Sequence, residues 1–135
     1  YLIAGDMTAL PAISVNLAAL PADACGFAAI EIQDTADRPD LVVPEGVTVE
    51  WLVNPEPGQR PDLLVDALRT AGRPDGRLAG WGACEFSSMR KLRDYLRGEL
   101  GLGAADLYIS SYWKHGLVED EHKQVKRADA EAQGV

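Results

Sequence analysis

The residues best suited to chemistry follow the first apolar run of the chain. Gly5, Asp6 and Thr8 come directly after residues 1–4, and Pro11 stands at the start of a helix-like stretch. A strand that turns tightly into a helix presents backbone N–H groups and the positive end of the helix dipole, which suit a phosphate. Gly5 lets the backbone approach a ligand closely, and the Thr8 hydroxyl can donate to a phosphate oxygen. The turn therefore predicts a nucleotide site with Gly5, Asp6 and Thr8 as contacts.

The same turn also fits a plain capped helix start. A carboxylate at Asp6 would repel a pyrophosphate, so Asp6 is expected either to cap the helix or to bond a ribose hydroxyl. The Gly-x-Gly-x-x-Gly fingerprint of dinucleotide-binding turns is absent from the chain. Spacing alone favours neither interpretation.

Small residues fill the segment Gly80-Trp81-Gly82-Ala83-Cys84-Glu85, at the expected end of a later strand. Small side chains leave room for a flat ligand against the backbone, so Ala83, Cys84 and Glu85 are candidates to border one. They would equally allow a helix to pack closely on the sheet, and both interpretations stay open.

Aromatic and basic side chains gather at the end of the last expected strand. Tyr112 and Trp113 can stack on planar rings, and Lys114 can hold an anion. A Tyr-Trp pair also packs commonly with one edge in water. Ligand binding is the favoured interpretation of this segment.

An acid after the second expected strand fits a ribose contact. A dinucleotide-binding fold places a carboxylate there, and of Glu31 and Asp34 the better candidate is Asp34. No cluster of arginines follows at once, although Arg38 is within reach, which favours NADH over NADPH. Taken singly, each acid is also explained as solvated loop charge.

Composition restricts the class of protein. The 135 residues are 47% hydrophobic and 25% charged, as expected for one globular domain with a real core. The net charge of −8 argues against a nucleic-acid partner. No apolar run reaches the roughly 18 residues of a membrane helix, so no membrane association is expected.

Three further side-chain sets are given structural interpretations. Cys25 and Cys84 are predicted to be buried, reduced thiols of a cytosolic protein. His115 and His122 lack closely spaced partners, so no metal site is expected. A face of the longest expected helix carries three arginines that are predicted to be solvated, namely Arg90, Arg93 and Arg97.

Hydrophobic periodicity predicts alternating strands and helices. Strands are expected at residues 1–4, 27–32, 47–53, 78–84 and 106–112, and a short edge strand is considered at 41–43. Helices are expected at residues 8–20, 62–71 and 85–100. Residues 119–133 are helix-prone but lack an apolar face, so on their own they should fray or be disordered. The pattern predicts an α/β fold, a Rossmann-like three-layer sandwich with a central parallel sheet of about five strands and helices on both faces. Ligands of such sheets bind at the carboxyl ends of the strands.

Four segments occur along the chain in a recognisable order. They are Gly5-Asp6-Met7-Thr8-Ala9-Leu10-Pro11-Ala12-Ile13, the pattern Trp81-x-Ala83-x-Glu85, residues 90–101, and Tyr112-Trp113-Lys114-x-Gly116 with Glu119-Asp120. Together they resemble the C-terminal domain of siderophore-interacting proteins, which are FAD-dependent ferric-siderophore reductases related to the ferredoxin-reductase superfamily. The resemblance covers essentially the whole chain.

The resemblance implies how the chain is divided. Residues 1–117 would form the NAD(P)H-binding domain, and residues 118–135 a polar helix or tail lying against the flavin domain. A β-barrel that binds FAD would precede residue 1, so the chain is expected to be a piece of a larger cytoplasmic reductase and to be inactive alone.

The resemblance also implies roles for the candidate residues, with no catalytic side chain among them. Gly5, Asp6 and Thr8 would contact the phosphates or ribose of NAD(P)H. Ala83, Cys84 and Glu85 would line the nicotinamide. Tyr112, Trp113 and Lys114 would face FAD and the ferric siderophore. Within this group, Lys114 would attract an anionic chelate. Many relatives carry Gly where this chain has Cys84 and Ser111, so contacts at those two positions can differ.

A stand-alone α/β nucleotide-binding or regulatory interaction module is the alternative. A receiver-like domain would need an acid at the end of the third strand, where this chain has Val53-Asn54-Pro55. A flavodoxin-like FMN carrier would need a phosphate loop rich in Ser and Thr, and only Thr8 is present.

Overall fold

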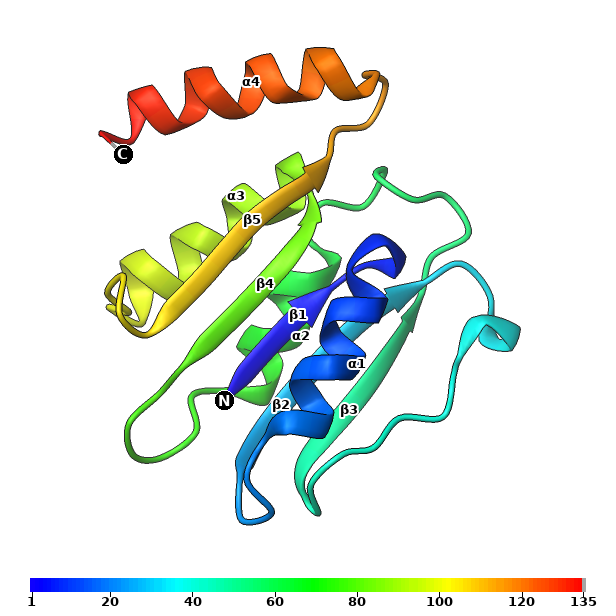
Figure 1. Ribbon diagram of the computed structural model, residues 1–135, viewed down its shortest axis with the longest axis vertical. Helices are drawn as coiled ribbons and strands as arrows, with labels where there is room; N and C mark the ends of the chain where they lie inside the picture. The colour runs from blue at the N-terminus through cyan, green and yellow to red at the C-terminus, as the bar shows by residue number, and fades with distance from the viewer. Residues whose placement is uncertain (135) are drawn as a thin grey trace.

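The computed structural model describes residues 1–134, so Val135, the last residue of the expected tail, lies outside the described part. Five strands form one parallel sheet in the order β3-β2-β1-β4-β5 (Figure 1). The strands are β1 Leu2–Gly5, β2 Cys25–Ile32, β3 Gly46–Val53, β4 Gly80–Glu85 and β5 Leu107–Trp113. The helices are α1 Leu10–Ala19, α2 Leu63–Ala71, α3 Phe86–Arg93 and α4 Glu119–Ala132. Three short helical segments complete the fold: η1 Met7–Ala9, η2 Thr35–Asp37 and the π-helical η3 Asp94–Glu99, which continues α3.

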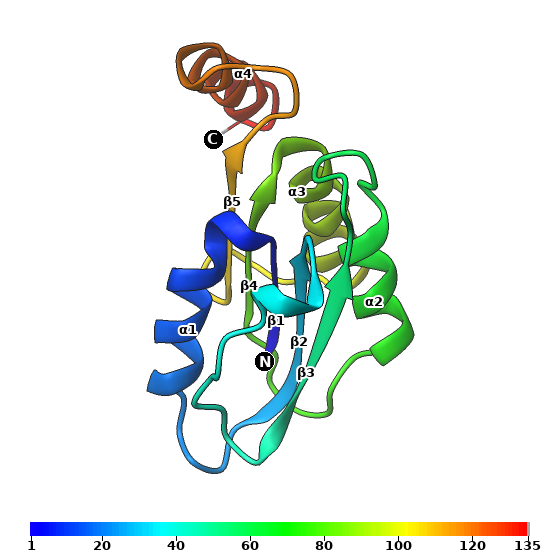
Figure 2. The ribbon, with the colours of Figure 1, turned by 90° about the vertical axis from the view of Figure 1, so that its right-hand side faces the viewer.

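Helices cover both faces of the sheet. Helix α1 lies on one face, whereas α2 and α3 lie on the other (Figure 2). The chain moves outward from β1 to β3 and then crosses back to β4, and right-handed crossovers in opposite directions place helices on opposite faces. Two apolar clusters result, one under α1 around Ile13 and Leu17 and one under α2 and α3 around Leu68 and Leu92. The predicted three-layer α/β sandwich is confirmed.

Two glycines allow these layers to approach closely. A Cβ atom on Gly5 would lie 2.7 Å from Cδ1 of Ile13 and 2.8 Å from the Ala83 carbonyl oxygen. A Cβ atom on Gly82 would lie 2.7 Å from Cδ1 of Ile109. Both glycines are buried, so their small size serves the packing of helix and strand on the sheet.

The short edge strand that the sequence analysis considered at residues 41–43 is absent from the structure, so this prediction is wrong. Leu41 and Val43 are half-buried and pack against the cluster under α1, but they join no strand. Pro39 and Pro44 flank the segment, and proline has no N–H to donate to a sheet ladder. The edge of the sheet on this side is therefore β3.

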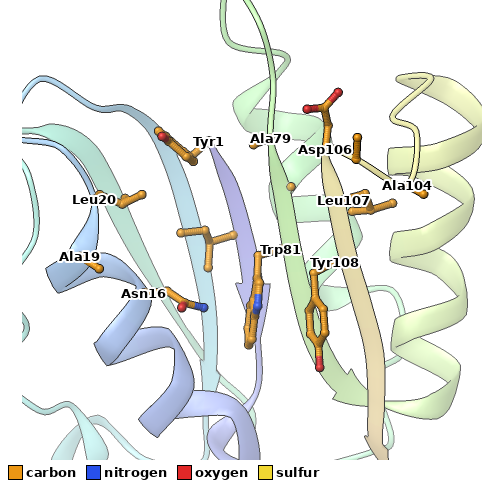
Figure 3. Close-up of a pocket in the computed structure, with 13 residues that line it drawn as sticks. Tyr1, Asn16, Ala19, Leu20, Ala79, Trp81, Ala104, Asp106, Leu107 and Tyr108 are labelled. Atoms are coloured by element: carbon orange, nitrogen blue, oxygen red, sulfur yellow. The ribbon is translucent and has the colours of Figure 1, made fainter.

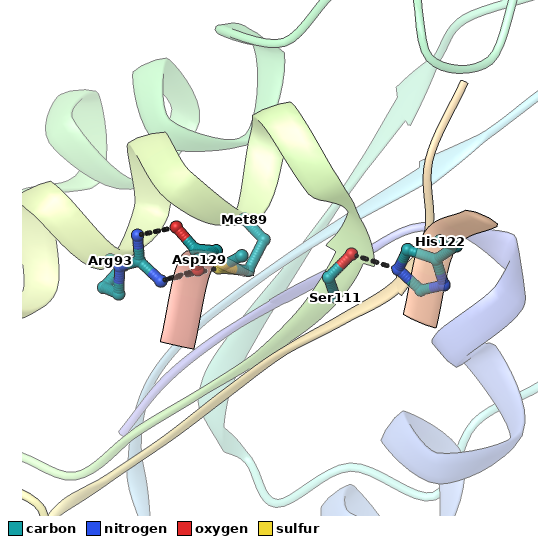
Figure 4. Close-up of polar contacts among 5 residues, drawn as sticks. All are labelled: Met89, Arg93, Ser111, His122 and Asp129. Carbon is teal, nitrogen blue, oxygen red and sulfur yellow. Dashed lines mark hydrogen bonds and ion pairs between the residues drawn. The ribbon is translucent and has the colours of Figure 1, made fainter. Parts of the chain in front are cut away.

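Residues 119–132 form the regular helix α4, so the polar C-terminal helix expected from the sequence is present, and it does not stand on its own as the argument for fraying assumed. The helix lies beyond the end of β5 (Figures 1 and 2) and is tied to the domain by two polar contacts (Figure 4). Ser111 Oγ and His122 Nε2 are 2.7 Å apart. Arg93 donates to both carboxylate oxygens of Asp129, at 2.8 and 3.1 Å. Buried polar contacts thus replace the missing apolar stripe.

Two predictions of exposure are also wrong. Arg93 is only 8% exposed, because it faces Asp129 and not water. Cys25 is exposed at the start of β2, whereas Cys84 is buried as predicted. Among residues 1–134, no helix is both long and apolar enough to cross a membrane. In the same residues, no three His, Cys, Asp or Glu side chains gather closely enough to hold a metal ion.

Candidate functional site

A crevice lies at the carboxyl ends of the strands, where a Rossmann-like sheet binds its ligands. Its volume is about 260 Å³. Residues from the ends of β1, β2, β3 and β5 line it together: Asp6, Met7, Thr8, Glu31, Ile32, Gln33, Asn54, Pro57 and Trp113. The expected convergence of several strand ends at one site is therefore present.

The carboxylate of Asp6 joins three strand ends at this crevice. One oxygen, Oδ2, accepts from the Glu85 backbone N–H at 2.9 Å and from the Trp113 indole N–H at 2.8 Å. The other, Oδ1, accepts from the Thr8 N–H at 3.0 Å and from the Thr8 hydroxyl. Asp6 is only 6% exposed. It caps η1, as one sequence interpretation expected, and it also binds β4 and β5 to β1.

Both hydrogen-bond donors of Thr8 are therefore used within the protein. Its N–H and its hydroxyl both point to Asp6, although its side chain also borders the crevice. Gly5 is buried beneath Ile13 and does not line the crevice. Contacts from Gly5 and Thr8 to a phosphate stay a prediction.

A second buried carboxylate, Glu85, lies at the junction of β4 and α3. Its Oε1 accepts from the N–H groups of Ser87 and Ser88 at 2.8 and 3.3 Å, which caps α3. Its Oε2 accepts from the His115 N–H at 3.3 Å. Glu85 thus fixes the chain just beyond β5 and does not line the crevice.

Of Glu31 and Asp34, it is Glu31 that lines the crevice. Burial raises the pKa of Glu31, against the opposing effect of its hydrogen bond from Asn54, which is 3.3 Å long. Asn54 is itself buried and accepts from the Glu56 N–H at 3.1 Å. Sequence reasoning preferred Asp34, but a charged residue inside the apolar run 28–32 was the signal that pointed to Glu31.

Asp34 lies outside the crevice. It is exposed and caps η2, accepting from the Ala36 N–H at 2.8 Å, while Asp37 accepts from the Asp34 N–H at 3.0 Å. Arg38 is engaged too, with its guanidinium 5.5 Å from the centre of the Trp51 ring. A ribose contact from Asp34 stays a prediction.

The segment Ala83-Cys84 is core. Both side chains are fully buried, Ala83 in the cluster under α1 and Cys84 in the cluster under α2 and α3. Burial raises the pKa of the Cys84 thiol well above its ordinary value, and the carboxylates of Asp6 and Glu85 add to the effect. The structural interpretation of these small residues thus agrees with their buried positions, and their contact with nicotinamide stays a prediction.

The aromatic and basic residues at the end of β5 lie in three different environments. Trp113 lines the crevice, and a Cβ atom on Gly58 would lie 2.9 Å from its Cη2 atom, so the loop after β3 packs on the indole. Tyr112 is half-buried against the cluster under α1. The Lys114 ammonium lies 5.1 Å from the centre of the Phe86 ring, outside the crevice.

A larger hollow of about 500 Å³ lies at the opposite, amino ends of the strands (Figure 3). Trp81 and Tyr108 stack on each other along one wall, with ring centres 5.5 Å apart, and α1 forms the other wall. None of the residues that sequence reasoning proposed for a ligand lines this hollow. We therefore take the smaller crevice as the candidate site.

The parallel sheet, its strand order and the helices on both faces define a Rossmann-like α/β type of domain. Residues 1–116 match the family model described as "Siderophore-interacting protein". The chain belongs to the siderophore-interacting protein family.

Relatives and solved structures agree with this family. The chain is 32% identical to the ferric vibriobactin reductase ViuB of Vibrio cholerae, over 92% of this chain and 46% of that protein. A siderophore utilization protein from T. fusca superposes with a TM-score of 0.82 at 34% identity, covering 91% of this chain and 48% of the other. The siderophore-interacting protein SipS from Aeromonas hydrophila gives 0.83 at 30% identity, covering 97% and 52%. The chain thus spans about half the length of these relatives.

Proposed function

We propose that this chain is the NAD(P)H-binding part of a flavin-dependent ferric-siderophore reductase. Family membership and the name of ViuB support a siderophore-related reductase. The observation that carries the nucleotide role is the crevice, in which Asp6, Glu31 and Trp113 meet from three different strands. Because these strands end at one edge of the sheet, their side chains form a single binding wall.

The residues present fit the ring and ribose of a nucleotide better than its phosphates. Glu31 and Asn54 offer oxygen acceptors for ribose hydroxyls, and Trp113 offers an aromatic face. No Lys or Arg lines the crevice among residues 1–134. Its 260 Å³ is just below the roughly 300 Å³ at which small-molecule pockets begin, so it holds one half of a dinucleotide. The pyrophosphate would lie at the rim, beside Met7 and Thr8.

The relatives are about twice as long as this chain. In this proposal, FAD is held mainly by a separate domain that corresponds to the part of the relatives that this chain does not match. When bound, FAD accepts an electron pair from NAD(P)H and delivers single electrons to Fe(III) in the siderophore. Residues 1–117 form the nucleotide-binding unit in this proposal, and residues 118–135 are the polar helix or tail that follows it. Tyr112 and Trp113 would present aromatic surface toward the flavin, and Lys114 would attract an anionic siderophore. The reductase would act in the cytoplasm.

The test is a nucleotide titration of the chain with Glu31→Gln and Asn54→Ala variants. We expect both to weaken NADH binding about tenfold, because each removes a hydrogen bond to ribose. Glu45→Gln, an exposed residue before β3, is the matched control. Unchanged affinity in both variants would refute the site. For the complete family protein, NADH-dependent reduction of a ferric siderophore that requires FAD tests the reaction itself.

A further inference from the structure

A hydrogen bond across the crevice joins the end of the first strand to the end of the last. Trp113 follows Asp6 by 107 residues, yet its indole N–H lies 2.8 Å from Asp6 Oδ2. Strand β4 stands between β1 and β5 in the sheet. The indole therefore reaches across the end of β4 to become part of a crevice formed mainly by β1, β2 and β3.

The pairing of β4 with β5 is irregular at the position that re-aims this side chain. Cys84 pairs with Ser111, but Glu85 pairs with Trp113, which leaves Tyr112 as an extra residue. Such bulges turn the following side chain and are common beside binding sites. The loop at Gly58, which has φ of +83°, then packs on the far end of the indole.

Asp6 has little capacity left for a ligand. Its two oxygens accept four hydrogen bonds, all from Thr8, Glu85 and Trp113. A carboxylate has about four lone-pair positions, so these partners saturate it. A direct bond from Asp6 to ribose or phosphate would require one of these bonds to break.

We propose that Asp6 is a positioning residue, which holds the Trp113 indole as the wall of the crevice against which the planar ring of the bound nucleotide stacks. This role rests on the proposed nucleotide function. Asp6 acts through Trp113 and touches neither nucleotide nor flavin. Trp113 thereby determines the width of the site.

The positioning step is tested without any ligand, by the indole N–H signal of Trp113 in ¹H–¹⁵N spectra, assigned with Trp113→Phe. In Asp6→Asn we expect this signal to move and its hydrogen exchange to accelerate about tenfold, as for loss of a hydrogen bond to a charged group. Asp75→Asn, in an exposed loop, and observation of the Trp81 indole are controls. An unchanged Trp113 signal in Asp6→Asn overturns the positioning role.

The stacking step is tested by NADH titration of the same variants. Asp6→Asn and Trp113→Phe should each weaken binding about tenfold, and the double variant should bind no more weakly than Trp113→Phe alone. Additive losses would mean that Asp6 contacts the nucleotide directly, which overturns the proposal. If Asp6→Asn does not fold, Trp113→Phe still decides: it keeps a ring but lacks the N–H, and undiminished NADH affinity refutes the tether.

The two measurements separate two kinds of failure. A Trp113 signal that responds to Asp6→Asn while NADH affinity stays constant overturns the stacking role, and the crevice itself fails as the nucleotide site only if Glu31→Gln and Asn54→Ala also leave NADH affinity unchanged. A Trp113 signal that does not respond, with Glu31→Gln still weakening NADH binding, overturns the positioning role alone.

Discussion

The two cysteine side chains lie in opposite environments, and their reactivity should differ accordingly. Cys84 is fully buried between β4 and the helices, and burial raises the pKa of its thiol. Cys25 is exposed at the start of β2. Thiolate is the reactive form, so reagents should modify Cys25 in the folded chain and leave Cys84 intact. Mass spectrometry after iodoacetamide treatment should show one label in buffer and two in denaturant. Two labels in buffer, or one label retained by Cys25→Ser, would contradict this.

At the scale of single residues, polar contacts between side chains far apart in the sequence are the feature that is hardest to predict from the sequence. A cap at Asp6 was one of the interpretations that the sequence left open, because an acid before a helix start commonly accepts N–H groups, and the structure has this cap. Nothing local in the sequence says that Glu85 and Trp113 also donate to it, since those contacts depend on how distant strands register. For the same reason, Arg93 was predicted to be solvated although Asp129 covers it.

Among the elements, helix α4 depends most on a single ion pair. The side chains of Arg93 and Asp129 are 9% and 14% exposed, and Arg93 Nε has no hydrogen-bond partner within the described residues. Removing one partner of a buried pair costs about 3–5 kcal/mol, more than the partial burial of Val125 can offset. We therefore expect Asp129→Ala to undock α4 without unfolding the sheet.

Hydrogen exchange measures this undocking directly. In Asp129→Ala, protection of the amides of residues 119–132 should fall about hundredfold, while those of β2 should stay protected. Alanine has the higher helix propensity, so the loss would not reflect a poorer helix former. Glu131→Ala is the matched control on the same helix, because Glu131 is exposed. Full protection of α4 in Asp129→Ala would show that other contacts hold it.

The second tie of α4 should make its docking depend on pH. Burial lowers the pKa of His122, and Nδ1 has no partner among residues 1–134. The neutral ring is therefore favoured in the docked state, whereas the undocked ring titrates near pH 6.5. Docking should be strongest above pH 6.5 and weaken as the pH falls below it. The charged groups that act on His122 are Lys126, Glu119, Glu85 and Lys114.

Exchange of the α4 amides between pH 7.5 and pH 5.5, corrected for intrinsic rates, checks this expectation. His122→Gln should remove most of the pH dependence, since glutamine does not titrate in this range. His115→Gln is the control, because His115 is exposed. A pH dependence that survives His122→Gln would assign the effect to another group.

The sequence predicted which helices and strands form far better than it predicted which contacts hold them in place. Five strands and three helices follow from periodicity, and all eight are present. The edge strand considered at 41–43 is absent, because Pro39 and Pro44 flank the apolar residues and proline has no N–H for a sheet ladder. The docking of helix α4 on the domain could not be predicted, because a periodicity argument counts apolar faces and this helix docks through His122 and Asp129.

At the scale of the whole molecule, the carboxyl edge of the sheet explains both the success and the limits of the site prediction. Parallel strands must end together, so the gathering of Asp6, Thr8 and Trp113 could be predicted from element order. Which side chains face the crevice depends on strand register and on the bulge at Tyr112. That is why Asp34 was preferred to Glu31, and why the sequence left the two interpretations of Cys84 open.

Net charge gives the whole molecule one further measurable property. The chain carries −8, and the crevice is lined by two carboxylates and by no cation among the described residues. NADH is an anion, so association should be opposed by repulsion whose range shrinks from about 30 Å at 0.01 M salt to about 8 Å at 0.15 M. NADH should therefore bind about two- to threefold more tightly at the higher salt, and NADPH, with its extra phosphate, should gain more and bind more weakly throughout. Calorimetric titration at both salt concentrations measures the effect.

An affinity for NADH that falls as the salt concentration rises would contradict this expectation and would reveal a cationic contact. The Lys114→Gln variant would then show whether Lys114 supplies that contact, because only its loss would abolish the dependence of affinity on salt.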